Sequence, residues 1–125
     1  MTPTILIVDD HEAFRASLGD WLNAHFPQCS IFDFDNGKEA VAFARTISPT
    51  IVIMDISMPG LDGIEATQQI KTAAPDVKII ILTIHEDQIY HAHALAAGAS
   101  AYIPKHRMRT ELQPTLTRLL AQRGT

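Results

Sequence analysis

The sequence predicts an α/β fold, a doubly wound parallel sheet of five strands with helices on both faces. Apolar runs alternate along the chain with segments of helical periodicity, which is the pattern of repeated βα units. Three of the runs, 5–8, 51–54 and 79–82, are apolar on both faces, as strands are when helices cover both sides of a sheet. Right-handed crossovers then predict the strand order 2-1-3-4-5.

The two remaining strands have weaker patterns. Residues 31–35 alternate apolar and polar side chains, so we place this strand at an edge of the sheet. Residues 101–103 form a short fifth strand. In this order the switch point lies between strands 1 and 3, and ligands of such folds bind there, beyond the carboxyl ends of the strands.

The predicted helices lie between these runs. The third is expected over about 64–74 and the fourth over about 87–97, with Gly98 as its C-terminal stop. The first and the last each have apolar residues at i, i+4, i+7 and i+8, on one helical face. These residues are Phe14, Leu18, Trp21 and Leu22, and Leu112, Leu116, Leu119 and Leu120.

Capping signals mark two helix starts. Asn36 and Glu39 have the spacing of a capping box at the second helix, and Thr110 and Gln113 have it at the last. Pro114 follows closely, and we expect it to weaken the first turn of that helix or to shift its start. The inner face of the second helix is expected to consist of Ala40, Phe43, Ala44 and Ile47.

Length and composition limit the function. A chain of 125 residues with 46% hydrophobic residues is expected to form one domain, 1–125, with one core. Its net charge of −4 argues against direct binding to nucleic acid or to an anionic membrane. A single cysteine fits a reducing compartment, and the first apolar run is too short for a signal peptide or a membrane span. We therefore expect a cytoplasmic protein.

Five polar side chains stand at or just past the ends of the apolar runs. Asp9 and Asp10 end the first strand, Asp55 ends the third, Thr83 ends the fourth, and Lys105 follows the fifth. The carboxyl ends of parallel strands meet at one edge of a sheet, so these groups are expected to share one crevice. Singly, Asp10 would be read as a helix N-cap and Lys105 as a solvated surface lysine; their joint placement favours a site.

Three carboxylates in one crevice need a cation or protons. At about 5 Å they repel by roughly 3 kcal/mol per pair at an effective dielectric constant near 20. Oxygen ligands of this kind suit Mg²⁺, which prefers to share its shell with a phosphate, and Lys105 adds a positive charge for a phosphoryl oxygen. A carboxylate beside a metal ion and an ammonium group can be a nucleophile toward phosphorus, forming an aspartyl phosphate.

These residues lie in segments that resemble the receiver domain of bacterial two-component response regulators. The resemblance covers nearly the whole chain. Within the family, the chain is most similar to the NarL/FixJ (LuxR-type) group. It implies a flavodoxin-like (βα)5 fold in which Asp55 accepts a phosphoryl group from a sensor histidine kinase. The matching segments are 7–11, 54–63, 81–83 and 98–102, together with Lys105. Considered without the rest of its segment, Asp62-Gly63 would be read as a turn.

The resemblance also implies roles for the neighbouring residues. Asp9 or Asp10, Asp55 and the main-chain carbonyl of Ser57 would bind Mg²⁺. Thr83 and Tyr102 would be paired switch residues, and Lys105 would bind the phosphate. Phosphorylation would then promote a homodimer or partner binding, through the face of helix 4, strand 5 and helix 5 or through helices 1 and 5. Members of this group usually contact DNA through a C-terminal domain, and the last residues, 120–125, read like the start of a linker.

Some residues differ from the usual receiver pattern. Pro104 precedes Lys105 instead of following it, and Ile84 is bulkier than the small residue common there and is expected to narrow the access to Asp55. Ser57 and His85, two positions after Asp55 and Thr83, would flank the approach of water to the phosphorylated aspartate. Neither is a water-positioning amide or carboxylate, so we predict a slowly decaying phosphoform.

Two other functions remain open at this stage. A stand-alone receiver would act by binding a protein target directly. An aspartyl-nucleophile phosphatase would place its nucleophile and acid two residues apart on the first loop, whereas here Asp9 and Asp10 are adjacent and the candidate nucleophile is on the third strand. As a receiver, the protein would be no enzyme beyond self-phosphorylation from small donors and self-dephosphorylation. His85, His91 and His93 are read as surface residues, since the last two are split across a helix.

Overall fold

The computed structural model describes residues 2–122, which form a five-stranded parallel sheet with the order β2-β1-β3-β4-β5. The predicted fold class and strand order are confirmed. The strands are β1 (Thr4–Val8), β2 (Ser30–Phe34), β3 (Ile51–Met54), β4 (Lys78–Thr83) and β5 (Ala101–Pro104). The helices are α1 (Glu12–His25), α2 (Gly37–Ile47), α3 (Gly63–Ala73), α4 (Gln88–Ala97) and α5 (Met108–Ala121), with a 3₁₀ turn, η1 (Lys105–Arg107), before α5.

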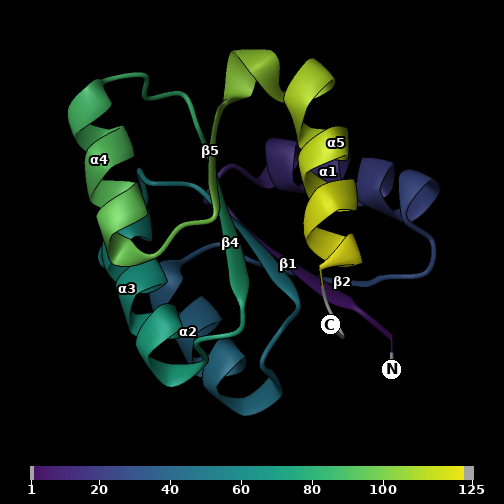
Figure 1. The fold of residues 1–125 in the computed structure, drawn as a ribbon, viewed down its shortest axis with the longest axis horizontal. Helices are drawn as coiled ribbons and strands as arrows, with labels where there is room; N and C mark the ends of the chain where they lie inside the picture. The colour runs from purple at the N-terminus through teal and green to yellow at the C-terminus, as the bar shows by residue number, and fades with distance from the viewer. Residues whose placement is uncertain (1, 123–125) are drawn as a thin grey trace.

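The molecule has three layers. In Figure 1, α2, α3 and α4 lie on one side of the sheet, and α1 and α5 lie on the other. This arrangement follows from right-handed crossovers that change direction at β1. Within the described residues, no helix is long and apolar enough to cross a membrane.

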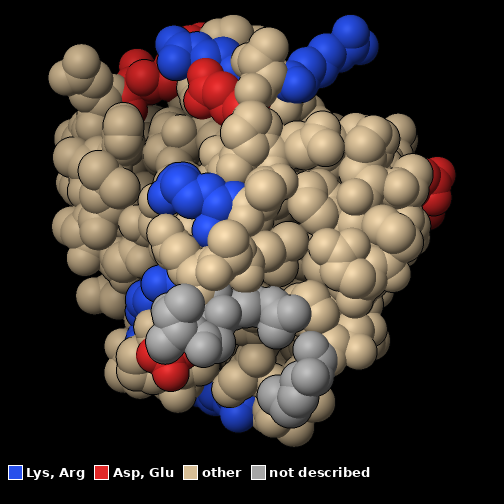
Figure 2. Space-filling view, turned by 45° about the vertical axis from the view of Figure 1, so that its right-hand side comes forward, with Lys and Arg blue, Asp and Glu red and all other residues tan. Residues whose placement is uncertain are grey.

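The surface is unevenly charged. Figure 2 brings the α5 side of the molecule forward and shows few charged side chains in the middle of that face, with most of them at its upper and lower margins. A face of this kind has little charge to remove from water if another surface covers it.

The capping contacts at three helix starts differ in whole or in part from the pattern-based expectations. Asn36 caps α2 as predicted, accepting a hydrogen bond from the Glu39 N–H at 2.9 Å, but the Glu39 carboxylate accepts from the Asn36 side-chain amide instead of its main chain. Asp62 is the N-cap of α3, bonded to the Glu65 N–H at 2.9 Å, so the reading of Asp62-Gly63 as a simple turn is wrong. Asp10 is not a cap, because the N-cap of α1 is His11.

The capping box expected at Thr110 and Gln113 is also wrong. The last helix begins at Met108, and the Thr110 hydroxyl donates to the carbonyl of Arg107 instead of receiving an N–H bond. Pro114 is consequently inside the helix, where it has no N–H to offer the preceding turn. The helix tolerates this because one face, containing Leu112, Leu116 and Leu119, is buried against the sheet.

The buried face of α2 is shifted from the expected one. Ala40 and Ala44 are buried and Phe43 is partly buried, as predicted, but Ile47 is 51% exposed and Val41 is buried in its place. Ile47 is the last residue of the helix, at the end of its contact with the sheet. The periodicity could not show where that contact ends.

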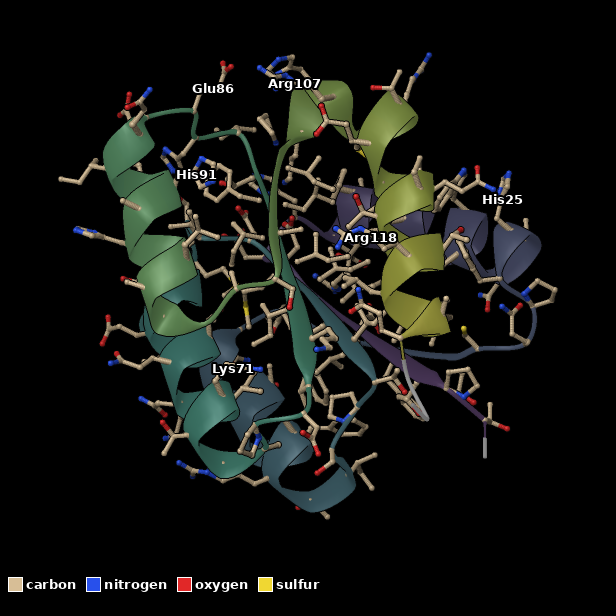
Figure 3. All side chains as sticks on the ribbon, viewed as in Figure 1. His25, Lys71, Glu86, His91, Arg107 and Arg118 are labelled. Atoms are coloured by element: carbon tan, nitrogen blue, oxygen red, sulfur yellow. The ribbon has the colours of Figure 1, made fainter. Side chains whose placement is uncertain are left out.

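Gly98 ends α4 as predicted, with a φ of 110°. A Cβ atom there would be 2.9 Å from Cγ of Lys71, which α3 places against this turn. Lys71 (Figure 3) donates from Nζ to the carbonyls of Pro75 at 2.5 Å and Val77 at 2.9 Å. Partial burial, with the charge of Lys78, lowers the pKa of Lys71. Lys71 therefore ties α3 to the turn between α3 and β4, and its side chain lies against the end of α4 at Gly98.

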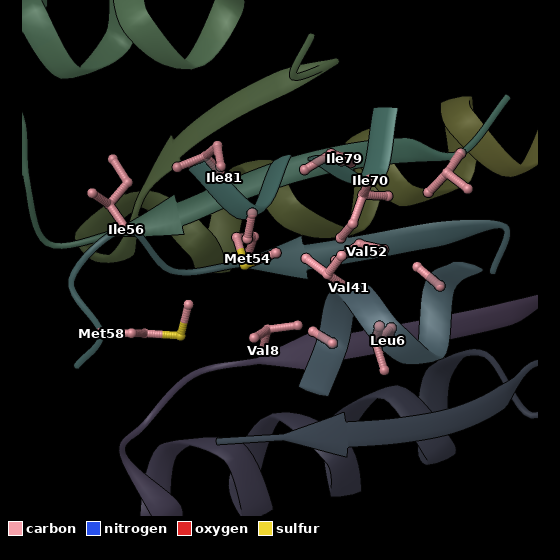
Figure 4. Packing of buried hydrophobic residues seen from close by; sticks show 14 of the residues in the cluster. Leu6, Val8, Val41, Val52, Met54, Ile56, Met58, Ile70, Ile79 and Ile81 are labelled. Carbon is pink, nitrogen blue, oxygen red and sulfur yellow. The ribbon is translucent and has the colours of Figure 1, made fainter. Parts of the chain in front are cut away.

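Side-chain alternation along the central strands fills two hydrophobic clusters, one on each face of the sheet, so the expectation of one core is wrong. Leu6 and Val8 point to the α2–α3–α4 side, where Figure 4 shows them packed with Val41, Val52 and Met54 among others. Ile5 and Ile7 point to the α1–α5 side. Each fully buried aliphatic side chain contributes about 1.5–3 kcal/mol. Strand β2 pairs only with β1, which confirms its predicted position at an edge, and Phe32 on this strand is 44% exposed.

Candidate functional site

Three acidic side chains meet beyond the carboxyl ends of β1 and β3. Asp9 and Asp55 are 2% and 4% exposed, and Asp10 is exposed at the rim. One ligand atom from each of these residues and one from His11 all lie within 4.8 Å of one another. The predicted clustering of Asp9, Asp10 and Asp55 is therefore confirmed, and its cause is that the carboxyl ends of parallel strands meet at one edge of the sheet.

Lys105 enters the same crevice from η1. Its Nζ is 2.8 Å from Oδ2 of Asp9 and 3.8 Å from Oδ2 of Asp55. The ammonium group also lies 4.1 Å from the centre of the Phe14 ring of α1, which favours a cation over its face. Lys105 is thus a partly buried counter-charge to two carboxylates and lies where an anion bound at Asp55 could contact it.

Burial dominates the electrostatics of Asp55. It raises the pKa of the carboxyl group, opposed first by the Lys105 charge; the nearby Asp9 charge adds to the rise, while the Thr83 hydroxyl and the Ile56 N–H lower it. The Ile56 N–H donates to Oδ1 at 2.8 Å. A cation in the crevice would favour the charged form of Asp55, the form that is a nucleophile.

Gly63 lets α3 approach Asp55 closely. The Gly63 N–H donates to the carbonyl of Ile56 at 2.9 Å, and a Cβ atom at this position would lie 1.9 Å from the main-chain oxygen of Asp55. Only glycine fits such an approach of backbone to backbone. Sequence reasoning treated this glycine as a turn residue and missed its role in positioning the acidic site.

Two residues at the start of α1, its N-cap His11 and Arg15 of its first turn, were also missed. Arg15 donates from Nη1 to the carbonyl of Asp9 at 2.8 Å and from Nε to Oδ2 of Asp33 at 2.7 Å, which holds the turn against β2. His11 places Nδ1 3.3 Å from Oδ1 of both Asp9 and Asp10. The signal for both was their position in or next to the first helical turn after the Asp pair.

The predicted switch residues surround the β4–α4 loop. Thr83 is fully buried, and its hydroxyl accepts from the His85 N–H at 3.3 Å. The Tyr102 hydroxyl donates to the carbonyl of His85 at 2.8 Å. Figure 3 shows His91 of α4 turned toward β5, where its ring stacks on Tyr102 with centroids 4.7 Å apart and planes at 13°. Thr83 and Tyr102 therefore contact the same loop residue from opposite ends of its backbone.

Ser57 and His85 are in direct contact. The Ser57 hydroxyl and Nε2 of His85 form a hydrogen bond between the loops that follow β3 and β4, and the His85 ring packs on Tyr90 at 4.7 Å. His85 is therefore not a free surface side chain. Ile84, expected to narrow the access to Asp55, is 70% exposed, so most of its surface faces solvent. The bond between Ile103 and Pro104 is trans.

The comparison with protein families decides the identity. The model of the response regulator receiver domain matches residues 5–117. The chain belongs to the response regulator receiver family. Receivers are phosphoacceptor signalling modules of two-component systems and not enzymes, which excludes the phosphatase alternative and implies a cognate histidine kinase.

The curated relatives include a transcriptional regulatory protein and a response regulator protein. The chain is 36% identical over 121 residues to the transcriptional regulatory protein DegU of Brevibacillus brevis, covering 96% of this chain and 50% of the relative. It is 38% identical over 107 residues to the response regulator protein VraR of Staphylococcus aureus, covering 84% of this chain and 50% of the relative. The chain thus spans about half the length of the curated relatives it matches.

Solved receiver structures have the same fold. A LuxR-family two-component response regulator from Aurantimonas sp. matches with a TM-score of 0.89 and 32% identity, over 98% of this chain and 88% of that one. Response regulator TrrA of Thermotoga maritima, solved in complex with Mg(2+)-BeF, matches with a TM-score of 0.83 and 31% identity, over 94% and 98%. These relatives confirm the resemblance to the LuxR-type group.

Proposed function

We propose that this receiver accepts a phosphoryl group on Asp55 from the phosphohistidine of a sensor kinase, with Mg²⁺ as the cofactor. The observation that carries the proposal is the placement of a nearly buried Asp55 carboxylate between two further carboxylates and the Lys105 ammonium group. A buried carboxylate with both kinds of neighbour is suited to nucleophilic attack on phosphorus.

The residues present fit Mg²⁺. Asp9, Asp10 and Asp55 would hold it through carboxylate oxygens and Ser57 through its main-chain carbonyl, the oxygen ligands that this ion prefers. The Mg(2+)-BeF complex of TrrA supports this choice of ion. When bound, Mg²⁺ would neutralise charge between the carboxylates and an incoming phosphoryl group.

Side chains of this protein perform the phosphoryl transfer. A carboxylate oxygen of Asp55 attacks phosphorus, the new O–P bond forms as the P–N bond breaks, and the kinase histidine leaves with the electron pair. Lys105, already 3.8 Å from Oδ2 of Asp55, pairs with a phosphoryl oxygen, and the buried Thr83 hydroxyl can donate to another. Each of these contacts is strongest when charge has spread over the phosphoryl oxygens.

Signal output would follow from the Thr83 contact. If Thr83 donates its hydroxyl to a phosphoryl oxygen, its Oγ1 turns toward the phosphate and away from the His85 N–H, from which it accepts at 3.3 Å, while Tyr102 holds the other end of His85. We expect the change to alter the face of α4, β5 and α5 or the α1–α5 side and to promote self-association. Phe14, Leu18, Trp21 and Leu112 line a groove between α1 and α5.

Within the whole protein, residues 1–125 would form the receiver and a DNA-binding domain would be the output. The support is the half-length match to a transcriptional regulatory protein and to a response regulator protein, and the match to a structure described as a DNA-binding response regulator of the LuxR family from S. aureus. A stand-alone receiver that binds a protein target directly is the second candidate. The coding sequence after Thr125 distinguishes the two.

The phosphoacceptor is tested by mass spectrometry. Acetyl phosphate with Mg²⁺ should add one phosphoryl group to the wild type and none to Asp55→Asn, while the exposed control Asp20→Asn should react normally. Asp10→Ala and chelation of the metal should each remove most of the reaction, because the site has few ligands to spare. A mass gain that survives in Asp55→Asn would refute the assignment.

The output is tested by sedimentation of the chain with and without beryllofluoride. We expect a larger particle in its presence, and the same for Asp20→Asn but not for Asp55→Asn. An unchanged mass together with unchanged affinity for a partner would refute the switch.

A further inference from the structure

One side chain in the acidic cluster is of a different chemical kind from the rest. His11 follows Asp10 directly, and its Nδ1 is 3.3 Å from Oδ1 of Asp9 and 3.3 Å from Oδ1 of Asp10. The proposed function uses only the carboxylates and Lys105. The imidazole is therefore a nitrogen donor at an otherwise oxygen-only site.

The backbone fixes the position of His11. It is the N-cap residue of α1, and its N–H donates to Oδ1 of Asp9 at 2.8 Å. Its main chain is therefore held at the same carboxylate that would bind the metal ion, and its exposed ring can still turn. Nδ1 now lies within hydrogen-bond distance of Oδ1 of Asp9, at 3.3 Å. The side chain is 70% exposed, so an ion that replaces this contact would leave the ring proton on Nε2, in water, and would meet the lone pair of Nδ1.

The spacing of the four groups is close to that of ligands on one ion. The ligand atoms of Asp9, Asp10, His11 and Asp55 lie within 4.8 Å of one another. Two ligand atoms of a tetrahedral Zn²⁺ ion, each about 2.1 Å from it, are about 3.4 Å apart, so the widest pair has to close by up to roughly 1.4 Å. Asp10 and His11 are both exposed and are free to make that movement.

The donor set determines which ions gain from His11. Mg²⁺ prefers oxygen and gains little from imidazole, whereas Co²⁺ and Zn²⁺ bind imidazole well. We propose that His11 is a metal ligand of this receiver, so that its acidic site binds Co²⁺ and Zn²⁺ more tightly, relative to Mg²⁺, than the carboxylates alone would. The inference rests on the proposed metal site and adds a selectivity to it.

Calorimetric titration of the untagged chain with Co²⁺, Zn²⁺ and Mg²⁺ tests the proposal. His11→Ala should weaken Co²⁺ and Zn²⁺ binding by about tenfold or more, and Mg²⁺ binding by less than about threefold. His93→Ala, which removes an exposed histidine of α4, is the matched control and should change neither. In the Co²⁺ form, proton NMR should show a hyperfine-shifted, exchangeable ring N–H signal that is missing in His11→Ala.

The alternative role of His11 gives the opposite result. If its ring is only a counter-charge to the carboxylates, His11→Ala should bind all three ions more tightly, and that result overturns the proposal. An equal loss for Mg²⁺ and for the transition ions, or an unchanged N–H signal, overturns it as well. Asp55→Asn tests the metal site separately from the role of His11, because Mg²⁺ binding that survives in that variant refutes the acidic metal site itself.

Discussion

The Ser57 hydroxyl is hydrogen-bonded to Nε2 of His85, which joins the loop after β3 to the loop after β4 beside Asp55. The two residues are 28 positions apart. His85 is held from three further directions, through its N–H by Thr83, through its carbonyl by Tyr102 and on its ring by Tyr90. A side chain fixed in this way is poorly suited to guiding a water molecule.

We therefore expect the phosphorylated state to decay slowly. Replacing Ser57 by Asn and His85 by Glu together removes the bridge and supplies an amide and a carboxylate that can orient water, so the double variant should lose phosphate faster. Mass spectrometry after removal of acetyl phosphate measures the decay. Ser17→Asn with His93→Glu, both exposed and outside these loops, is the control. A wild type that decays as fast as the double variant would contradict the idea.

Asp55→Asn should stabilise the metal-free protein at neutral pH. Burial raises the pKa of this carboxyl group, so the folded state binds its proton more readily than the unfolded chain does. The stability of the wild type should consequently fall as the pH rises above the ordinary value of 3.8 toward the folded pKa, and the advantage of Asn should grow over that interval. Denaturant unfolding across pH measures it. Mg²⁺ should reduce the difference, and Asp20→Asn should show none.

Lys105→Met should destabilise the metal-free fold. It leaves the nearly buried Asp9 without its 2.8 Å partner, and we expect a loss of about 2–3 kcal/mol, below the range for fully buried pairs because water reaches part of the site. Mg²⁺ should restore part of the loss by supplying another cation. Urea unfolding with and without Mg²⁺ checks this, with exposed Lys38→Met as the control. A loss that Mg²⁺ does not reduce would show that packing on Phe14 is what matters.

Gly63→Ala should lower the stability by about 3 kcal/mol or more and slow phosphorylation, because its Cβ would lie 1.9 Å from the oxygen of Asp55. Gly19→Ala is a matched control in α1, where the nearest atom is 3.9 Å from the new Cβ. That variant should gain about 0.5–1 kcal/mol from its higher helix propensity. Thermal unfolding of the two variants checks both directions, and equal effects would refute the close-approach argument.

Thr67→Val should stabilise the protein by about 1 kcal/mol. The Thr67 hydroxyl is fully buried in α3 and has no hydrogen-bond partner among the described residues, so an isosteric methyl group removes a polar group that is buried at a cost. Thr72→Val is the control on the same helix, since that hydroxyl is exposed and donates to Gln68. Chemical unfolding that shows Thr67→Val to be less stable would mean that an internal water molecule satisfies the hydroxyl.

The sequence by itself determined the layers of the fold and the acidic crevice. Strands apolar on both faces have to be covered on both sides, and residues that follow such strands have to meet at one edge of a parallel sheet. Both are consequences of local pattern and connectivity. Asp9, Asp10, Asp55 and Lys105 were found together for that reason, although Lys105 is 96 positions from Asp9.

Only the tertiary structure decided the contacts that depend on distance between elements. The exposure of Ile47 and the start of α5 at Met108 depend on how far each helix overlaps the sheet. The need for glycine at position 63 depends on how closely α3 approaches Asp55. The ring positions of His11 and His85 depend on loop geometry, and hydrophobic periodicity carries no information about loops because their side chains do not alternate between core and solvent.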